Sequence, residues 1–316
     1  MQIYITQGHE QGIGLEVFFK TTLLLSPKSI SRVTLLAYPN AVASTLNSLK
    51  LPFEVSHDEI IIAGRAIKTI WLNEVNYSQS FTSLQRGMSL AEKGGILFTL
   101  PTSKDQFPKG AGHTEYFRTH YEKEELGMYF SSPTIKLLLI SDHIPLSQVS
   151  TSLTEEVIYQ RLKSALKSLK DWRWPIDQVL IAGFNPHAGE KGLIGDEDER
   201  VNMVINRLRS EVPFKMSGPL PGDTILLEKR SNDDLLVYLY HDQGLGVFKG
   251  IQGFIGSNIT LGLPYPRFSP DHGTSFGLYG KNLADYRGCA YSLKEAFFLL
   301  ENLADGKNTS NKSKSS

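Results

Sequence analysis

Short runs of apolar residues alternate along this chain with longer stretches in which apolar residues recur every three or four positions. The short runs are typical of buried β-strands, and the longer stretches are typical of amphipathic helices. Besides a first strand over residues 1–6, the pattern predicts strands over residues 33–37, 95–99, 135–140, 179–182, 235–240 and 258–261. Because helices alternate with these strands, we expect βαβ units with parallel pairing, and hence an α/β fold.

Two helices are predicted most clearly. The first begins with the capping-box pattern Ser152-Leu-Thr-Glu155, in which a hydroxyl and a carboxylate satisfy free backbone N–H groups at a helix start. An apolar stripe at helical spacing follows, made of Val157, Ile158, Leu162, Ala165, Leu166 and Leu169. The second helix is predicted over residues 197–209.

The composition is that of a globular protein which binds a small molecule. With 316 residues, 41% of them hydrophobic, the chain can bury a sizeable core in two domains or in one large α/β unit. Lys and Arg together number 33, as do Asp and Glu, so there is no basic surplus that would favour nucleic acid or an anionic membrane. We therefore expect neither as a partner.

The single cysteine, Cys289, excludes an intrachain disulfide and a cysteine-based zinc cluster. It is expected to be a small buried side chain. A chain with a single cysteine fits a reducing cytoplasm. Since no apolar run reaches 18 residues, we expect a cytoplasmic protein without a membrane span. The polar residues 309–316 are expected to form a disordered tail.

Three of the predicted strands are followed by a histidine: His143, His187 and His241. A single histidine at a strand end is more often a hydrogen-bonded surface residue than a ligand. In an α/β sheet, however, the carboxyl ends of the strands form the crevice where ligands bind, so three such imidazoles can converge. Three neutral imidazoles with an open fourth position make a catalytic metal centre, and we take this as the hypothesis.

The residues beside these histidines suit that chemistry. They are of types that orient imidazoles or act as acid and base around a metal, namely Asp142, Asn185, Asp242 and Gln243.

Other loops carry groups that suit an anionic substrate. The segment Gly110-Ala-Gly-His113-Thr114 offers backbone amides, an imidazole and a hydroxyl at a helix start. Lys249 is able to hold a phosphate or carboxylate, or to carry a proton if buried, and Arg267 is able to grip such a group with two hydrogen bonds. Each is a weak signal alone, because isolated surface cations are common.

The opening loop, Gly8-His-Glu-Gln-Gly12-Ile-Gly14, joins the first strand to a predicted helix. Glycine-rich turns of this kind admit cofactor phosphates, but the spacing is not G-x-G-x-x-G. A Rossmann fingerprint is therefore absent.

Taken together, the motifs of the chain resemble those of the 4-hydroxythreonine-4-phosphate dehydrogenase family of vitamin B6 biosynthesis. The resemblance extends from Thr6 to about residue 305 and is strongest after residue 110. The motifs that carry it are Gly112-His-Thr-Glu115, Asn185-Pro-His-Ala-Gly-Glu190, Gly218-Pro-Leu-Pro-Gly-Asp-Thr224, Tyr240-His-Asp-Gln-Gly-Leu245 and Ser269-Pro-Asp-His-Gly-Thr274.

The resemblance implies a fold similar to isocitrate and isopropylmalate dehydrogenases, with two α/β/α domains around a central cleft. A cofactor-side domain is then expected over residues 1–104 and 256–308, and a metal, substrate and dimerisation domain over residues 105–255. It also implies a homodimer whose subunits share their active sites.

The implied activity is NAD- or NADP-dependent oxidation of 4-phosphohydroxy-L-threonine to a β-keto acid. This acid decarboxylates to 3-amino-2-oxopropyl phosphate, on the way to pyridoxine 5'-phosphate. A divalent metal such as zinc, magnesium or cobalt would polarise the hydroxyl, and either Asp242 or Lys249 would take its proton.

Carried over residue by residue, the resemblance implies three sets of binding positions. The metal ligands are His143, His187 and His241. The substrate-binding residues are His113, Thr114, Lys249, Asn258 and Arg267. The cofactor-binding residues are Gly12, Gly14, Asp271 and Gly280.

The chain departs from the family on the cofactor side. His9, Glu10 and Gln11 stand where the family usually has an acidic residue, proline and alanine, and Leu15 replaces a proline. Gly277 stands where the family commonly has aspartate. A non-catalytic relative with impaired cofactor binding is therefore one alternative, beside a dehydrogenase of threonate or erythronate 4-phosphate and a metal hydrolase.

Overall fold

The computed structural model describes the backbone of residues 1–312 and the side chains of residues 1–304. The chain forms two compact units. Unit 1 comprises residues Met1–Glu122 and the chain from Leu263 onward, and unit 2 comprises residues Lys123–Gly262. No helix in the described part of the chain combines the length and the apolar character needed to span a bilayer.

The borders of the units differ from those expected from the sequence. Residues 105–122 belong to unit 1, where Tyr121 at the end of α5 (His113–Tyr121) shares a hydrogen bond of 2.9 Å with the hydroxyl of Tyr265. Residues 256–262 belong to unit 2, because β12 (Ser257–Leu261) pairs with β7 (Gly127–Ser131). Strand partners such as these cannot be read from motif spacing.

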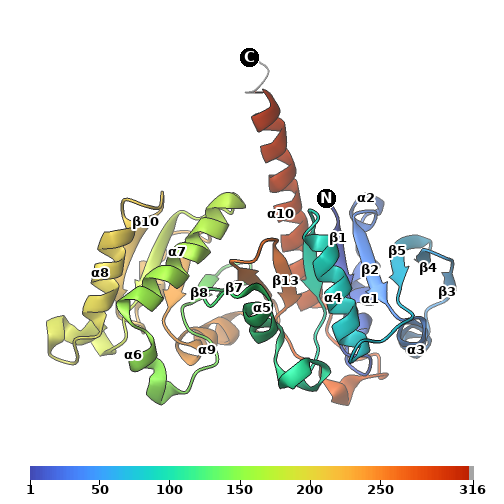
Figure 1. The fold of residues 1–316 in the computed structure, drawn as a ribbon, viewed down its shortest axis with the longest axis horizontal. Helices are drawn as coiled ribbons and strands as arrows, with labels where there is room; N and C mark the ends of the chain where they lie inside the picture. Colours follow the sequence, from blue (N-terminus) through green and yellow to red (C-terminus); the bar gives the residue numbers. More distant parts are fainter. Residues whose placement is uncertain (313–316) are drawn as a thin grey trace. The chain divides into compact units, whose positions relative to one another are not determined.

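Unit 1 is built on a mainly parallel sheet (Figure 1). In the order β13-β6-β1-β2-β5-β4-β3, the first five strands run parallel, β4 runs antiparallel to β5, and β3 runs antiparallel to β4. The strands are β1 (Ile3–Thr6), β2 (Val33–Ala37), β3 (Phe53–Val55), β4 (Glu59–Ile62), β5 (Arg65–Trp71), β6 (Ile96–Thr99) and β13 (Arg267–Pro270).

The helices of unit 1 cover this sheet. α4 packs against β1, β2 and β6, and α10 packs against β13 and β6. The helices, with the short 3-10 turns, are α1 (Gly14–Thr22), α2 (Pro27–Ile30), α3 (Pro39–Leu49), α4 (Gln79–Ala91), η1 (Lys104–Gln106), η2 (Pro108–Gly110), α5 (His113–Tyr121), η6 (Phe276–Leu278) and α10 (Arg287–Lys312). Cys289 of α10 is buried, as the sequence predicts.

The strands of unit 2 are hydrogen-bonded in the order β10-β9-β11-β8-β7-β12. The first four strands are parallel, and β7 runs antiparallel to both of its neighbours. Its elements are β7 (Gly127–Ser131), β8 (Lys136–Leu139), η3 (Leu146–Gln148), α6 (Val149–Ser152), α7 (Glu155–Asp171), β9 (Gln178–Ala182), η4 (Pro186–Gly192), α8 (Asp198–Leu208), β10 (Lys215–Leu220), η5 (Ile225–Glu228), β11 (Leu235–Tyr238), α9 (His241–Gln252) and β12 (Ser257–Leu261).

Side chains of alternate residues give unit 2 two packed faces. On one face, Phe248 of α9 lies 5.7 Å from Phe130 of β7, measured between ring centroids. On the other face, Gly127 of β7 leaves room for Leu138 of β8 and Ala165 of α7. Unit 2 is therefore a sheet covered on both faces by helices.

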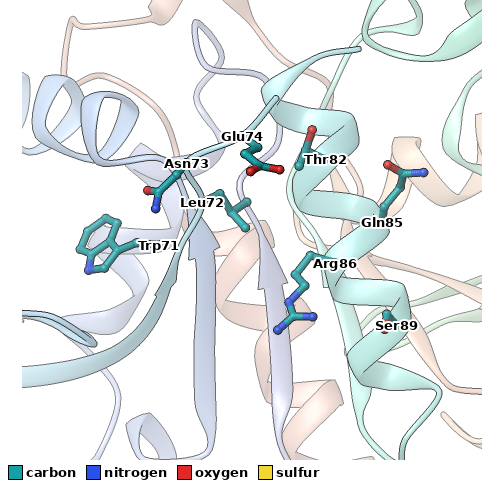
Figure 2. A pocket seen from close by; sticks show the side chains of 8 residues that line it. All are labelled: Trp71, Leu72, Asn73, Glu74, Thr82, Gln85, Arg86 and Ser89. Carbon is teal, nitrogen blue, oxygen red and sulfur yellow. The ribbon is translucent and has the colours of Figure 1, made fainter. Parts of the chain in front are cut away.

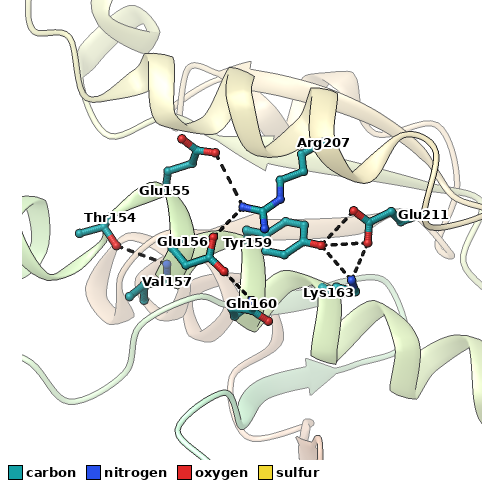
Figure 3. Close-up of polar contacts among 9 residues, drawn as sticks. All are labelled: Thr154, Glu155, Glu156, Val157, Tyr159, Gln160, Lys163, Arg207 and Glu211. Atoms are coloured by element: carbon teal, nitrogen blue, oxygen red, sulfur yellow. Dashed lines mark hydrogen bonds and ion pairs between the residues drawn. The ribbon is translucent and has the colours of Figure 1, made fainter.

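Charged side chains hold α8 against α7 (Figure 3). The guanidinium of Arg207 lies 3.4 Å from the ring centroid of Tyr159 and donates to Glu156 at 2.6 Å. The Tyr159 hydroxyl donates to Glu211, whose carboxylate also pairs with Lys163 at 2.6 Å. A stacked cation and the ion pairs beside it thus cover one side of the buried tyrosine.

Six of the predicted strands and both predicted helices are confirmed, with borders moved by a few residues, and the first strand is β1. Three details were wrong. The helix cap is Thr154, whose hydroxyl accepts from Val157 N–H, whereas Ser152 ends α6. β12 pairs antiparallel because its neighbour is β7 rather than a parallel core strand. The chain from residue 309 to 312 continues α10, since extending an existing helix costs little, and residues 313–316 of the predicted tail lie outside the described residues.

Two glycines on helices make a matched test of this packing. A Cβ added at Gly87 of α4 would lie 2.8 Å from side-chain atoms of Leu97 and Thr6, whereas one at Gly250 of α9 would meet nothing within 4 Å. We expect Gly87→Ala to lower the free energy of unfolding, since overpacking costs about 1–3 kcal/mol and an alanine recovers only about 1 kcal/mol of helix propensity. Gly250→Ala should instead raise it by up to about 1 kcal/mol. The free energies of unfolding are measured by urea denaturation. A higher value than wild type in both variants would contradict the tight packing around Gly87.

Candidate functional site

The three strands that lead to the candidate histidines are neighbours in unit 2. β8, β11 and β9 lie side by side and run parallel, so their carboxyl ends share one edge of the sheet. The residues that follow each strand, with His143, His241 and His187 among them, begin at this edge.

Two of the histidines lie together. The ring centroids of His143 and His241 are 5.4 Å apart, with the ring planes tilted by 42°. His241 is the first residue of α9, and His143 stands in the exposed loop after β8. Backbone hydrogen bonds continue the pairing of β8 and β11 past the strands, with Ser141 N–H donating to Leu239 at 2.9 Å.

The neighbouring carboxylate sets the tautomer of His241. Its Nδ1 lies 2.7 Å from Oδ1 of Asp242. Because a carboxylate only accepts, Nδ1 is the donor in this contact, and in the neutral form of the ring the lone pair is on Nε2. A ring held in this way by a carboxylate is the usual arrangement of a metal-binding histidine.

The loop that carries His187 is strained. Residues 187–191 all have positive φ, between 43° and 76°, although only Gly189 among them is glycine. Left-handed residues are costly for side chains with a Cβ, and such runs persist only where the surroundings hold them. Asp198, at the start of α8, provides this support by accepting from Phe184 N–H at 2.7 Å and from Asn185 N–H at 3.2 Å.

The donor set suits a divalent transition metal, because imidazole nitrogens bind zinc, cobalt and similar ions. His143 and His241 fit such an ion, since their rings lie 5.4 Å apart and the carboxylate of Asp242 lies at Nδ1 of His241, on the side of the ring away from Nε2. Among the described side chains of residues 1–304, however, no three of His, Cys, Asp or Glu are grouped as metal ligands. The assignment of His187 as the third ligand therefore stays a prediction.

The other candidates of unit 2 stand in α9 and β12. Lys249 is half-buried on α9, eight residues after His241 and thus about 12 Å further along the helix axis. Asn258, in β12, is half-buried opposite Phe130. Asp242 is 94% exposed, and its carboxylate faces the imidazole before it.

In unit 1 the structure brings together Arg267 and His113. Arg267, at the start of β13, is only 3% exposed and donates from Nη2 to the Thr99 hydroxyl at 2.6 Å. Burial lowers the pKa of Arg267 to about 10, so the guanidinium stays charged near neutral pH. A buried cation of this kind attracts an anionic group.

His113 is a neutral partner in this cluster. It opens α5, with Thr114 beside it, and its ring lies 5.0 Å from that of Phe107 and 6.2 Å from that of Phe117. Burial and then the charge of Arg267 hold the pKa of His113 well below its ordinary value of 6.5. A neutral imidazole beside a buried cation offers hydrogen bonds without adding a second charge.

The glycines of the opening loop serve close packing. A Cβ at Gly12 would lie 3.3 Å from the backbone oxygens of His9 and Thr274, and a Cβ at Gly14 would lie 3.0 Å from Leu100. The N–H of Ile13 also donates to Thr274 at 3.0 Å. These contacts explain why glycine suits positions 12 and 14 structurally. The role of Gly12 and Gly14 in cofactor binding stays a prediction.

The two segments that depart from the family pattern contact each other. The ring of His9 meets that of Phe276 edge-on, with centroids 4.8 Å apart. Gly280, after this segment, has φ of +73° and open space around its Cβ position. Asp271 follows directly after β13 and is half-buried. The cofactor roles of Asp271 and Gly280 stay predictions.

A further pocket of unit 1 is lined by none of these candidates (Figure 2). It has a volume of about 590 Å³ between the end of β5 and one side of α4. It is lined by Trp71, Leu72, Asn73, Glu74, Thr82, Gln85, Arg86 and Ser89. Its two charged residues, Glu74 and Arg86, are exposed.

Sequence reasoning missed two residues, one in each unit, that support candidate residues. Asp198 supports the strained loop, and Thr99 accepts two hydrogen bonds from Arg267. An aspartate at a helix start is a visible signal for the first. Nothing in the local sequence points to the second, because its partner lies 168 residues away.

Known proteins are similar to this chain over most of its length. Residues 20–298 match the model of the family described as "Pyridoxal phosphate biosynthetic protein PdxA". A 4-hydroxythreonine-4-phosphate dehydrogenase of Sulfurihydrogenibium sp. is 30% identical over 90% of this chain and 94% of that protein. A protein of Oceanobacillus iheyensis with the provisional name D-threonate 4-phosphate dehydrogenase is 34% identical over 72% of this chain and 71% of that protein.

Solved structures show the same fold. The crystal structure of 4-hydroxythreonine-4-phosphate dehydrogenase from Klebsiella pneumoniae has a TM-score of 0.77 at 27% identity, covering 94% of this chain and 99% of that one. A β-decarboxylating dehydrogenase of Thermococcus kodakarensis has a TM-score of 0.56 at 12% identity, covering 96% of this chain and 83% of that one. The second likeness concerns the fold alone. The expected α/β fold class, similar to that of the decarboxylating dehydrogenases, is thus confirmed.

The lowered pKa of His113 predicts a pH dependence of stability. Between the pKa of the folded state and 6.5, the unfolded chain binds a proton that the folded chain does not. The free energy of unfolding should therefore fall as the pH drops below about 6.5, by at most about 1.4 kcal/mol per pH unit from this group. We expect His113→Gln to lose this part of the slope in denaturation series from pH 5 to 7, whereas His120→Gln, at an exposed position of α5, should keep it. Equal slopes in wild type and His113→Gln would contradict the burial of a neutral ring.

Proposed function

Because this chain belongs to the PdxA family of pyridoxal phosphate biosynthetic proteins, we propose that it is the 4-hydroxythreonine-4-phosphate dehydrogenase of its pathway. The proposed reaction oxidises the secondary alcohol of 4-phosphohydroxy-L-threonine with NAD or NADP. The resulting β-keto acid loses carbon dioxide to give 3-amino-2-oxopropyl phosphate. Among the features of the structure, the pair of His143 and His241 carries this proposal furthest.

A divalent metal bound at these imidazoles would supply a Lewis acid that makes the substrate hydroxyl easier to deprotonate. His143 and His241 would hold it, and His187 would complete the set. The loop of His187 begins at the same sheet edge, and the family resemblance also allows it to come from the partner subunit of a homodimer. The nicotinamide, when bound, supplies the hydride acceptor.

The residues of unit 1 would bind the anionic end of the substrate. The buried guanidinium of Arg267 is charged, and the imidazole of His113 beside it is neutral. With the hydroxyl of Thr114 they offer several donors to a phosphate or carboxylate. Binding of these unreactive groups would orient the alcohol for oxidation.

Asp242 and Lys249 remain the two candidates for the proton. The contact of Asp242 with Nδ1 of His241 supports a second role for it, namely orientation of the ligand. Lys249 lies two helical turns further along α9, which favours the binding of a charged group at some distance from the histidines. Asn258 would add an amide to the same binding surface.

A second substrate class is favoured by one relative. The protein of Oceanobacillus iheyensis carries the name of a D-threonate 4-phosphate dehydrogenase, and its identity of 34% lies between the 30% and 37% of two relatives named for hydroxythreonine phosphate. The two substrates differ by an amino group and a hydroxyl of similar size. Oxidation of threonate or erythronate 4-phosphate is therefore the alternative reaction.

The activity test is a panel of substrates and cofactors. Purified protein with zinc, magnesium or cobalt should reduce NAD or NADP in the presence of 4-phosphohydroxy-L-threonine, which is read as absorbance of the reduced nicotinamide. Turnover with threonate or erythronate 4-phosphate alone would select the alternative substrate, and phosphate release without cofactor would indicate a metal hydrolase. Substrate binding without nicotinamide binding in calorimetry would indicate a non-catalytic relative. The contact of His9 with Phe276 motivates this last arm.

The ligand assignment predicts the effect of His241→Ala. A catalytic site needs each of its protein ligands, so this variant should lose most bound metal and nearly all dehydrogenase activity while it keeps its circular dichroism spectrum. His57→Ala, at an exposed position between β3 and β4, is the control and should retain both. An unchanged metal content in His241→Ala would show that this imidazole is not a ligand.

A further inference from the structure

A single hydroxyl holds the buried cation of unit 1. The Nε and Nη2 atoms of Arg267 both donate to Oγ1 of Thr99, at 3.0 Å and 2.6 Å. Arg267 is 3% exposed and Thr99 is 0% exposed. Nε and Nη2 share one edge of the planar guanidinium, so two bonds to one oxygen fix the direction in which this edge points.

The pairing of two strands explains why these side chains meet. β13 runs parallel to β6, and Arg267, the first residue of β13, is paired with Leu97. Paired residues point to the same face of a sheet, and residues two positions apart in one strand also share a face. Thr99, the last residue of β6, therefore lies on the face of Arg267, about 7 Å nearer to the carboxyl end of the strand.

The bonds to Thr99 hold the charge of Arg267 near the edge of the sheet where ligands bind. The side chain of Arg267 extends from the start of its own strand toward the carboxyl end of β6. In α/β folds the carboxyl ends of the strands form the binding crevice. The charge of Arg267 also acts on His113 at the start of α5, because together with burial it lowers the pKa of that imidazole.

The surroundings of Arg267 leave its charge poorly stabilised. Burial lowers the pKa of Arg267 to about 10, whereas hydrogen bonds to carboxylates raise the pKa of the exposed Arg207 and Arg287. The hydroxyl of Thr99 supplies a dipole and no opposite charge. An anion at the guanidinium would therefore recover part of the free energy that burial of the cation costs.

Among anions, phosphate fits this cation best. Its oxygens match the planar donors of arginine, as those of a carboxylate do. A phosphate monoester carries between about 1.5 and 2 negative charges near neutral pH, which is more than a carboxylate carries. It therefore gains more from a cation that no full charge compensates.

We propose that Thr99 is a positioning residue, which holds the guanidinium of Arg267 in the orientation that binds the phosphate group of the substrate. The inference rests on the part of the proposed function that assigns Arg267 to the anionic end of the substrate. Thr99 acts through Arg267, because its hydroxyl accepts from two donors of that side chain. Without this acceptor the guanidinium would lose the contact that fixes its direction.

Thr99→Val is the direct test, because valine keeps the shape of threonine and lacks the acceptor. Binding of inorganic phosphate and of 4-phosphohydroxy-L-threonine is measured by calorimetry. We expect both to bind about 10- to 100-fold more weakly, as for the loss of a hydrogen bond to a charged group. Thr99→Ser keeps the hydroxyl and should bind both like the wild type.

Thr69→Val is the matched control. Thr69 of β5 is 2% exposed, and its hydroxyl donates to the carbonyl oxygen of Ile67 at 3.0 Å. The substitution thus also removes a buried hydroxyl from a strand of unit 1, but none that contacts Arg267, and phosphate should bind as in the wild type. If Thr99 serves only the fold, Thr99→Val lowers the melting temperature and keeps its affinity for phosphate, which would overturn the inference.

Thr99→Cys keeps the test decisive if Thr99→Val does not fold. A thiol is a weaker acceptor of similar size, so we expect a smaller loss of phosphate affinity in the same direction. Wild-type affinity in Thr99→Val, or in Thr99→Cys where only that variant folds, would overturn the inference and leave the proposed function standing. A loss in Thr99→Ser as large as that in Thr99→Val would also overturn it, because the hydroxyl would then not be the group that acts.

Arg267→Met separates a failure of the inference from a failure of the proposed function. This variant removes the cation, and it should bind phosphate no better than Thr99→Val does. If Arg267→Met binds like the wild type, or if the wild type binds neither inorganic phosphate nor the substrate, the assignment of Arg267 to the anion is wrong and the inference fails with it.

Discussion

The parallel pairing of β8, β11 and β9 is the constraint on which the site of unit 2 depends. Parallel ladders place the carboxyl ends of neighbouring strands at one edge, where side chains from distant parts of the sequence come close. His143 and His241 are 98 positions apart and yet their rings meet. Backbone hydrogen bonds between β8, β11 and β9 therefore fix where the loops after these strands begin, although the strands themselves contain no candidate residue.

Unit 1 differs from unit 2 in this respect. Its candidate anion site contains a buried charged residue that stands within a strand rather than in a loop after one. Arg267 stands in a strand, among apolar rings, with the hydroxyl of Thr99 as a hydrogen-bond acceptor. Such a charge costs stability, and it also lowers the proton affinity of His113. The buried cation lowers the stability of the protein without ligand and favours the binding of an anion. This is consistent with a phosphorylated substrate.

Much of this organisation could be predicted from the sequence, and the limits have physical reasons. Apolar runs located the core strands because buried parallel strands need apolar side chains on both faces. The histidines after β8, β9 and β11 were visible because each follows such a run within a few residues. The capping residue was misplaced because Ser152 and Thr154 offer the same hydroxyl chemistry two positions apart, and only the backbone decides which one caps. Thr99 and the antiparallel partner of β12 depend on contacts between distant segments, which a single sequence does not display.

The left-handed turn at residues 187–191 has a consequence for how this protein tolerates change. Four of its five residues bear a Cβ in a conformation that glycine adopts freely, so the turn is maintained against the intrinsic preference of its own backbone. Glycine at Ala188 or Lys191 would relieve that strain but would also give the unfolded chain more freedom to lose. At these positions, relief of backbone strain in the folded state and the greater conformational entropy of the unfolded chain have opposite effects on stability. Variants selected in the laboratory for higher stability would show which of the two effects is larger.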